Sequence, residues 1–392
     1  MMKRLHLIAT LLMAFTTAMH AGDWMKNLPD NIYISQLSIP GTHDSGTGNG
    51  VALAAFSQCQ DIPVSQQWAA GIRAFDLRPK VKGSYININH GIAATKLRFD
   101  DALFLIRDSL AAHPSEFAVV HYHYDTDFDK DKDKYLPMLK SLLERDDMKD
   151  FLVPFRRDLT LGDVRGKMLL ISRQGYADPP YAGGCIGGWT SSLDWERQKE
   201  GWIIGMDHDY NSYTPLYMQD YYNFADNPAG FKEKTDAINQ LLDWSYAHMT
   251  TNPGDVVWVM NFTSAYPGGI PSANGYRKVA SYTNGTVINF FESRPPGPTG
   301  VIFMDYCVDW SNGYHTRGQE LIDTLIANNY KCFPTTNNNT SNSITTNKAN
   351  SLRHVIGIYS LQGNKLPEPQ RGAVNIMKYS DGTVEKVFVG RQ

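Results

Sequence analysis

Short hydrophobic runs alternate with longer amphipathic stretches between about residue 30 and residue 335. Runs of this length, rich in β-branched and aromatic residues, are typical of buried strands. They predict seven strands, over Ile32–Ile39, Ile72–Leu77, Tyr85–Asn89, Phe117–His123, Lys167–Ser172, Val256–Phe262 and Val301–Tyr306.

The stretches between these runs have helical spacing. In Lys96–Ala112 the hydrophobic residues Leu97, Ala102, Ile106 and Leu110 recur on one face. The predicted helices are Pro63–Ala70, Lys96–Ala112, Tyr135–Arg145, Phe231–Met249 and Gly318–Asn328. Alternating strands and helices predict a parallel sheet covered by helices. The number of strands favours an α/β, TIM-like barrel, either regular or distorted and open.

The pattern changes after the last predicted helix. Residues 337–350 are mostly Asn, Thr and Ser, which is typical of a linker. Three short strands are predicted beyond it, at His354–Ser360, Ala373–Tyr379 and Val384–Val389, with Asp381-Gly382 as a hairpin turn. We therefore expect a barrel domain over residues 22–336 and a small β tail over residues 351–392.

The N-terminus has the pattern of a secretory signal peptide. A basic start at Lys3-Arg4 precedes the apolar run Leu7–Thr17, and Ala18 and Ala21 offer small residues for cleavage. This run is too short to span a bilayer. We expect a signal peptide over residues 1–21, the alternative being an uncleaved anchor. No second long apolar segment occurs, so a secreted or cell-surface protein without a transmembrane segment is predicted.

Composition narrows the possible functions only slightly. Hydrophobic residues make up 42% of the chain, enough for a sizeable core, and the net charge of −3 does not favour nucleic acid as a partner. There are four cysteines, at positions 59, 185, 307 and 332, and no two of them have the C-x-x-C spacing typical of zinc sites. Export would permit disulfides in any of three pairings, and free buried thiols are the alternative.

Candidate catalytic residues follow several predicted strands. His43 and Asp44 lie in a Pro-, Gly-, Ser- and Thr-rich turn after the first strand, and His90 follows the third. Asp76, Arg78 and Asp305 also lie at strand ends. The active sites of α/β barrels are built at the carboxyl ends of their strands. Two histidines with carboxylates and an arginine suit acid–base chemistry on a phosphate ester.

These motifs occur in an order that resembles a known family. The segments are Ser38-Ile-Pro-Gly-Thr-His43-Asp44-Ser-Gly, Gly71-Ile-Arg-Ala-Phe-Asp76-Leu-Arg78, Asn89-His90-Gly91, His113-Pro-Ser-Glu116, Leu161-Gly-Asp-Val-Arg-Gly-Lys167, Gln219-Asp220-Tyr221-Tyr222-Asn223 and Val301-Ile-Phe-Met-Asp305-Tyr. Together they resemble the X-domain of bacterial phosphatidylinositol-specific phospholipase C over roughly residues 30–330.

The resemblance implies a role for each candidate. His43 would be the general base, oriented by Asp305, and His90 the general acid, with Asp44 beside it. Arg78 would bind the phosphate. Arg173, Asp220, Tyr222 and His123 would bind the inositol ring, Tyr222 by stacking. The products would be diacylglycerol and inositol 1,2-cyclic phosphate, formed by a lyase reaction at a membrane surface. A monomer is expected.

Two positions bear on cofactors and substrate. Calcium-dependent relatives have a carboxylate where this chain has Arg78, so we expect no cofactor and no metal. Bacterial relatives have a lysine where this chain has His123, so the headgroup could differ. His121 and His123 also share the spacing of a metal-binding pair, but no third ligand is evident. The Asp-rich segment 125–133 lacks the glycine and glutamate of a calcium loop.

Other interpretations remain open. The enzyme could hydrolyse a different headgroup phosphodiester directly, or the chain could be an inactive module that binds inositol glycans. The aromatic segments Trp189–Trp202 and Tyr210–Tyr222 are expected either to enter lipid or to join the core. The tail resembles the C-terminal sorting segments of the type IX secretion route, the alternative being a β appendage.

Overall fold

The computed structural model describes residues 21–124, 130–176, 178–189, 199–334, 355–367, 369–370, 373–379 and 384–389. The predicted signal peptide, apart from its last residue, and the predicted linker lie outside these residues, as does much of the Asp-rich segment.

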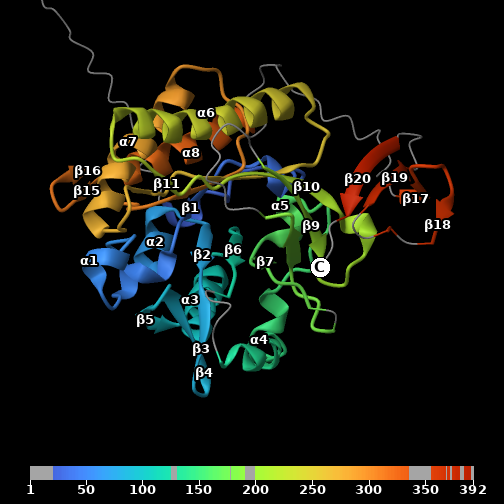
Figure 1. Cartoon of the computed structure of the whole chain (residues 1–392), viewed down its shortest axis with the longest axis horizontal. Coiled ribbons are helices and arrows are strands. Elements are labelled where there is room, and N and C mark those ends of the chain that lie inside the picture. Colours follow the sequence, from blue (N-terminus) through green and yellow to red (C-terminus); the bar gives the residue numbers. More distant parts are fainter. Residues whose placement is uncertain are drawn as a thin grey trace, which may run out of the picture.

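A closed barrel forms the centre of the molecule (Figure 1). Its strands are β1 (Ile39–Thr42), β2 (Ala74–Leu77), β6 (Ala118–Tyr122), β7 (Met168–Ser172), β8 (Gly184–Gly187), β9 (Lys199–Gly205), β10 (Thr214–Gln219), β12 (Trp258–Phe262) and β14 (Val301–Met304). The barrel closes because β1 pairs with both β14 and β2. Neighbouring strands are parallel except at β9, which runs antiparallel to β8 and β10. The predicted α/β barrel is confirmed, and it is closed.

Helices cover the outside of this barrel. They are α2 (Val64–Ala70), α3 (Phe99–Ala112), α4 (Tyr135–Leu143), α5 (Leu161–Val164), α6 (Pro228–Thr251), α7 (Ala273–Glu292) and α8 (Gly318–Cys332). The three long helices α6, α7 and α8 pack side by side along one flank (Figure 1). A further short helix, α1 (Ala54–Ser57), follows β1.

One predicted barrel strand belongs to a separate sheet. β3 (Pro79–Lys82), β4 (Tyr85–His90) and β5 (Ala93–Arg98) form an antiparallel sheet of their own. His90 therefore reaches the barrel from an appended hairpin, and the expectation that it ends a barrel strand is wrong. Two-residue strands form two smaller pairs, β11 (Asn223–Phe224) with β13 (Tyr266–Pro267) and β15 (Trp310–Ser311) with β16 (Tyr314–His315).

The first predicted strand is also misplaced. Ile34–Gln36 forms a 3-10 turn, and the strand begins only at Ile39. Ile32, Ile34 and Leu37 are buried, so their alternation reflects a loop packed on the core rather than a strand. The new strand β1 includes Gly41, where a Cβ atom would lie 2.9 Å from the Ala74 Cβ. A side chain at this position would separate β1 from β2.

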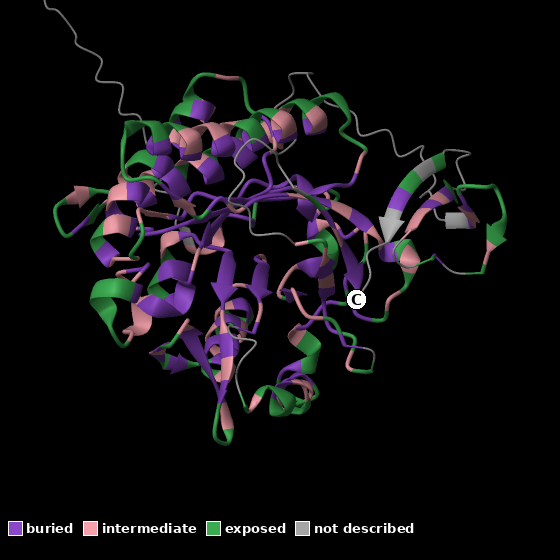
Figure 2. Cartoon of the chain, in the orientation of Figure 1, coloured by how far each residue is buried: buried purple, intermediate pink, exposed green. Residues whose placement is uncertain are grey.

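Helix α7 and the strands β8 to β10 were not predicted from the sequence. Helix α7 contains Gly275, Gly285 and several Asn and Thr residues, which have low helix propensity. It is stabilised by a buried face that includes Tyr276, Val279 and Val287. The barrel strands β1, β2, β6, β7, β12 and β14 are buried along their whole length, whereas β8, β9 and β10 include half-buried or exposed residues (Figure 2).

The tail forms a small antiparallel sheet, shown in red in Figure 1. Its order is β18 (Lys365–Leu366), β17 (Val355–Ser360), β19 (Ala373–Tyr379) and β20 (Val384–Val389). Three of these strands match the predicted ones, and β18 is additional. Met377 and Val387 of this sheet pack with Ile358 and with Tyr213, which precedes β10.

Two further observations concern export. None of the described helices combines the length and hydrophobicity needed to cross a bilayer. All four cysteines are free thiols, Cys59 and Cys307 buried and Cys185 and Cys332 half-buried, so of the two alternatives left open the structure has free thiols.

Candidate active site

The candidate residues meet at the carboxyl ends of neighbouring strands. His43 and Asp44 follow β1, Asp76 and Arg78 lie at the end of β2, and Asp305 follows β14. Because β14, β1 and β2 are adjacent in the barrel, these side chains converge. The backbone N–H of His43 donates to the Met304 carbonyl at 2.9 Å, which holds the two strand ends together.

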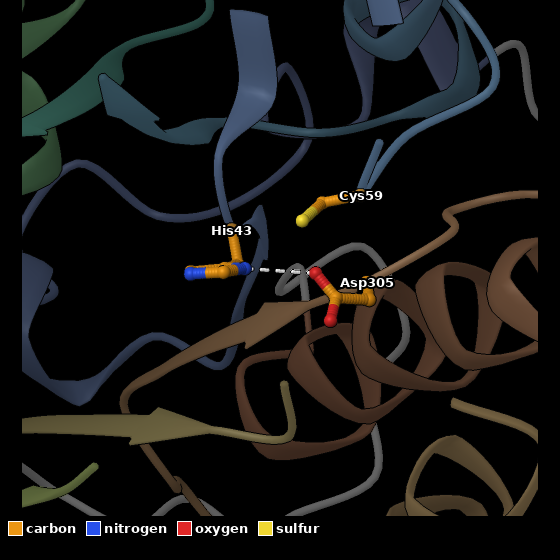
Figure 3. A group of neighbouring side chains, drawn as sticks. All are labelled: His43, Cys59 and Asp305. Carbon is orange, nitrogen blue, oxygen red and sulfur yellow. Dashed lines mark hydrogen bonds and ion pairs between the residues drawn. The ribbon is translucent and has the colours of Figure 1, made fainter. Parts of the chain in front are cut away.

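His43 and Asp305 form a buried hydrogen-bonded pair. His43 Nδ1 lies 2.8 Å from Asp305 Oδ1, as the dashed line in Figure 3 shows. Asp305 is 1% exposed, and a carboxylate in this position accepts a hydrogen bond from Nδ1–H. The proton is therefore held on Nδ1, and Nε2 is the ring nitrogen left to accept a proton.

Arg78 contacts the opposite edge of the His43 ring. Its Nη2 lies 3.0 Å from His43 Nε2 and 3.1 Å from Asp76 Oδ2, and its Nε lies 3.3 Å from Asp44 Oδ1. A guanidinium can only donate, so the contact with Nε2 is a hydrogen bond when His43 is neutral. When His43 is protonated, Asp44 Oδ2 at 3.3 Å from Nε2 becomes its partner. His43 Nε2 thus has Arg78 as its partner when the ring is neutral and Asp44 when the ring is protonated.

The charge balance around His43 favours protonation. Burial lowers the pKa of His43, but the carboxylates of Asp44 and Asp305 outweigh it and raise the pKa to about 9. Arg78 acts in the opposite direction. His43 is therefore a strong base for an imidazole.

His90 lies on the other side of Asp44. Its Nε2 is 3.6 Å from Asp44 Oδ2, and its Nδ1 donates to the Ser57 carbonyl at 2.7 Å. Asp44 itself has a positive φ of 44°, a backbone conformation that Asp tolerates better than most residues. The two histidines thus contact the same carboxylate, and Arg78 contacts its other oxygen.

The thiol of Cys59 packs against Asp44 and His90. Figure 3 shows it between His43 and Asp305, and its Sγ lies 3.9 Å from His90 Nδ1 and 4.0 Å from Asp44 Oδ2. Burial raises the pKa of the Cys59 thiol well above its usual range. Cys59 therefore stays protonated and is an uncharged packing partner of the catalytic group.

The predicted substrate-binding residues lie farther along the barrel rim. Arg173 follows β7, and its Nη2 is 3.9 Å from Oδ2 of Asp220, which follows β10. His123 is nearby, 6.1 Å from His121 between ring centroids. Tyr222 is 37% exposed and its described ring contact is with Tyr266, at 6.2 Å between centroids. The structure brings Arg173, Asp220 and His123 toward the site and leaves Tyr222 at the edge.

His123 cannot replace a lysine's charge. Burial lowers the pKa of His123 well below its usual value, and the nearby charges of Arg78 and Arg173 lower it further. The imidazole is neutral at neutral pH. Among the described residues, its Nδ1 is a buried atom without a hydrogen-bond partner, as are Arg173 Nη2 and Trp189 Nε1. Such unpaired polar atoms are expected where a ligand binds.

Sequence reasoning missed several residues of the site. Trp189 was expected at a lipid-contacting or core position. It packs against the core, where its ring stacks on His121 at 5.3 Å and lies under the Arg173 guanidinium at 3.5 Å. Gln60 was not considered, although its Nε2 donates to both the His43 and Met304 carbonyls. Asp76 was expected among the strand-end candidates and His121 as half of a metal-binding pair, and the hydrogen bond between them was not foreseen. No spacing rule links these positions, because they meet only when the barrel closes.

Several groups in the site have ligand atoms close enough to hold a metal ion. One is His43, Asp44 and Asp76, and another is Asp76, His121 and His123. In the first, the Arg78 guanidinium already contacts both carboxylates. In the second, Asp76 and His121 are hydrogen-bonded to each other at 2.8 Å. In the first group, the positive charge of Arg78 therefore lies beside the carboxylates that a cation would have to use.

Comparisons with known proteins agree with this geometry. No family model matches the chain. A 1-phosphatidylinositol phosphodiesterase of Staphylococcus aureus strain Newman is 24% identical over 308 residues, which cover 77% of this chain and 93% of that protein. One of Listeria monocytogenes is 32% identical over 159 residues, covering 38% of this chain and 48% of that protein.

Solved structures share the fold. A variant of the phosphatidylinositol-specific phospholipase C of Staphylococcus aureus superposes with a TM-score of 0.60 at 23% identity, covering 78% of this chain and 98% of its own. The Listeria monocytogenes enzyme superposes with a TM-score of 0.55 at 23% identity, covering 79% and 98%. These two matches extend over nearly the whole length of the solved proteins and over more than three quarters of this chain. The chain is thus similar, in sequence and in barrel fold, to the bacterial phosphatidylinositol-specific phospholipases C.

Proposed function

We propose that this protein is a phosphatidylinositol-specific phospholipase C of the lyase type. The observation that carries the proposal is the arrangement around Asp44. His43 Nε2 lies 3.3 Å and His90 Nε2 3.6 Å from the same Asp44 oxygen, with Arg78 on the other oxygen at 3.3 Å. Two imidazoles and one guanidinium are thus held around one carboxylate, close enough together to act on the same phosphodiester.

The geometry supports a two-step proton transfer. His43 Nε2 removes the proton of the inositol 2-hydroxyl, and that oxygen forms a bond to phosphorus. Asp305 and Asp44 stabilise the resulting imidazolium, as their contacts of 2.8 Å and 3.3 Å allow. Arg78 donates to the non-bridging phosphate oxygens, where charge builds up.

His90 completes the reaction as the acid. Its Nδ1–H is held by the Ser57 carbonyl, so the proton on Nε2 is the one available for transfer. It passes to the glycerol oxygen as the bond from phosphorus to that oxygen breaks. Asp44 stabilises the protonated ring before transfer. The products are diacylglycerol and inositol 1,2-cyclic phosphate, and water is not consumed.

Phosphorus NMR of phosphatidylinositol turnover tests this proposal. We expect the signal of a five-membered cyclic phosphate to appear first. A monoester formed directly would indicate hydrolysis, and no turnover would indicate a binding module. His43→Ala and His90→Ala should each lower kcat by roughly 10²-fold to 10⁴-fold. His113→Ala, at a surface histidine that contacts Asp23, is the matched control.

We also propose that no metal takes part. The support is Arg78, whose guanidinium contacts Asp44 and Asp76 within 3.3 Å. Turnover should be unchanged after dialysis against EDTA and after addition of calcium. Loss of activity in EDTA that calcium restores would contradict this expectation.

The location of the protein belongs to the same proposal. The basic and apolar N-terminus supports export with removal of residues 1–21, and the substrate would be met at a membrane surface by a monomer. The tail sheet contacts the barrel through Tyr213 but lies apart from the catalytic residues, in keeping with a sorting or accessory role.

A further inference from the structure

A continuous chain of hydrogen bonds joins the two halves of the site. Arg173 Nε donates to His121 Nε2 at 3.1 Å, and His121 Nδ1 lies 2.8 Å from Asp76 Oδ1. Asp76 Oδ2 in turn accepts from Arg78 Nη2 at 3.1 Å. These residues lie on or just after β7, β6 and β2, which are neighbours in the barrel. The chain therefore follows the rim from the predicted ring-binding arginine to the predicted phosphate-binding arginine.

The protonation state of His121 follows from its partners. Arg173 can only donate, so Nε2 must accept, and the single proton of the neutral ring lies on Nδ1. From Nδ1 it is donated to the Asp76 carboxylate. His121 is 0% exposed, and burial lowers its pKa, as do the charges of Arg173 and Arg78, against the opposing effect of Asp76. The ring is thus neutral with one tautomer.

The contacts of Arg173 leave it one orientation. Its Nε is used by His121, and its planar face lies 3.5 Å from the Trp189 ring centroid. Trp189 is itself stacked on His121 at 5.3 Å. The Nη2 atom remains without a hydrogen-bond partner among the described residues. The hydrogen bond to His121 and the stacking on Trp189 together direct Nη2 of Arg173 toward Asp220, 3.9 Å away.

Asp76 is fixed in a similar way on the other side. Burial opposes its ionisation, but Arg78 and His121 outweigh burial and hold the pKa of Asp76 well below its usual range. Its Oδ2 also accepts from the Asp44 backbone N–H at 3.2 Å. Asp76 therefore anchors both Arg78 and the turn that carries His43 and Asp44.

We propose that His121 is a positioning residue that holds Arg173 through Nε2 and Asp76 through Nδ1, and so sets the distance between the ring-binding and phosphate-binding parts of the site. This role rests on the proposed function for its kinetic consequences. The hydrogen-bond arrangement itself does not depend on which substrate is cleaved.

Two substitutions separate the two halves of this role. In His121→Asn the amide nitrogen takes roughly the place of Nδ1, so the bond to Asp76 is kept and the bond to Arg173 is lost. In His121→Gln the amide oxygen takes roughly the place of Nε2, so the bond to Arg173 is kept and the bond to Asp76 is lost. Each variant shortens or lengthens the side chain without adding a charge.

The expected kinetics differ in kind. His121→Asn should raise KM for phosphatidylinositol by about tenfold with kcat changed by less than about threefold, because Arg173 loses its orientation. His121→Gln should lower kcat by about tenfold with a smaller change in KM, because Asp76 and Arg78 are released. Equal effects of both variants on KM and kcat would overturn the proposal and leave His121 as a packing residue.

A measurement without substrate completes the test. In protein labelled with ¹⁵N-histidine, His121 should show the neutral Nδ1–H tautomer throughout the range in which the protein is folded. An Nε2–H tautomer or a charged ring at neutral pH would overturn the proposal, even if the variants fail to fold. If the unmodified protein does not cleave phosphatidylinositol, the proposed function fails, and the NMR result still decides the hydrogen-bond arrangement.

Discussion

At the scale of the residue, the site depends on which charges surround His43. The carboxylates of Asp44 and Asp305 raise its pKa to about 9 against the effect of burial. A base with a raised pKa accepts a proton readily but is mostly protonated at neutral pH. Arg78, whose Nη2 lies 3.0 Å from Nε2, favours the neutral form that catalysis requires. The balance between these neighbours sets the pH at which the enzyme works.

Removing one carboxylate should shift this balance. Asp305→Asn takes away a negative charge that stabilises protonated His43, so the pKa of His43 must fall. The acid limb of the kcat/KM profile should move to lower pH, while kcat falls by at least about 10²-fold because the imidazolium is no longer stabilised. A profile measured from pH 5 to pH 10 checks both effects. An unchanged acid limb would mean that His43 is not the base.

At the scale of the element, a buried ion pair links strands at the opposite end of the barrel. Arg73 directly precedes β2 and Glu116 precedes β6, and both side chains are 0% exposed. Their Nε to Oε2 distance is 3.1 Å, and Glu116 Oε1 also accepts from the Met25 backbone N–H at 2.9 Å. Two residues of the family-like motifs are therefore structural, which their position in the sequence alone does not show.

Breaking this pair should cost stability but not catalysis. Glu116→Gln leaves the Arg73 charge buried without a counter-charge, which typically costs about 3–5 kcal/mol of unfolding free energy. Urea denaturation measures the loss, and kcat of the folded protein should be unchanged. The control is Asp100→Asn, which removes the exposed pair with Arg98 and should cost less than about 1 kcal/mol. Equal costs in the two variants would contradict the structural role of Glu116.

At the scale of the whole molecule, exposed apolar side chains gather beside His90. Leu53 and Phe56 are 57% and 55% exposed, and Ile92 is 85% exposed. Phe56 directly precedes Ser57, whose carbonyl accepts from His90, and Ile92 lies two residues after His90. The Ala52 N–H donates to the Ala94 carbonyl, which brings the two segments together. This surface is suited to contact lipid.

Replacing these three residues should affect only the membrane-bound reaction. The variant Leu53→Ser, Phe56→Ser, Ile92→Ser should bind phosphatidylinositol vesicles at least about tenfold more weakly, because apolar area buried in lipid is lost. Turnover of a water-soluble short-chain substrate should be unchanged. Leu361→Ser, an exposed position of the tail sheet, is the control. Vesicle binding equal to that of the unmodified protein would rule out this docking surface.

The sequence by itself determined the class of fold and the chemistry of the site. Alternating strands and helices predicted the barrel, and the order of motifs brought out His43, Asp44, Arg78, His90 and Asp305, all of which meet in one contact network. Strand ends of a barrel must converge, so residues at those ends could be grouped without coordinates. Hydrophobic periodicity and short motifs depend only on residues close together in the chain, so they can be read from the sequence alone.

Only the tertiary structure decided the contacts between distant segments. His121, Trp189 and Arg173 meet because β6 and β7 are adjacent and Trp189, two residues after β8, packs against both side chains. Helix α7, with its low propensity, is formed by burial against its neighbours, which no window of sequence reveals. The same holds for His90, which a separate hairpin brings to Asp44. Long-range packing selects these arrangements, because their stabilisation comes from surfaces far apart along the chain.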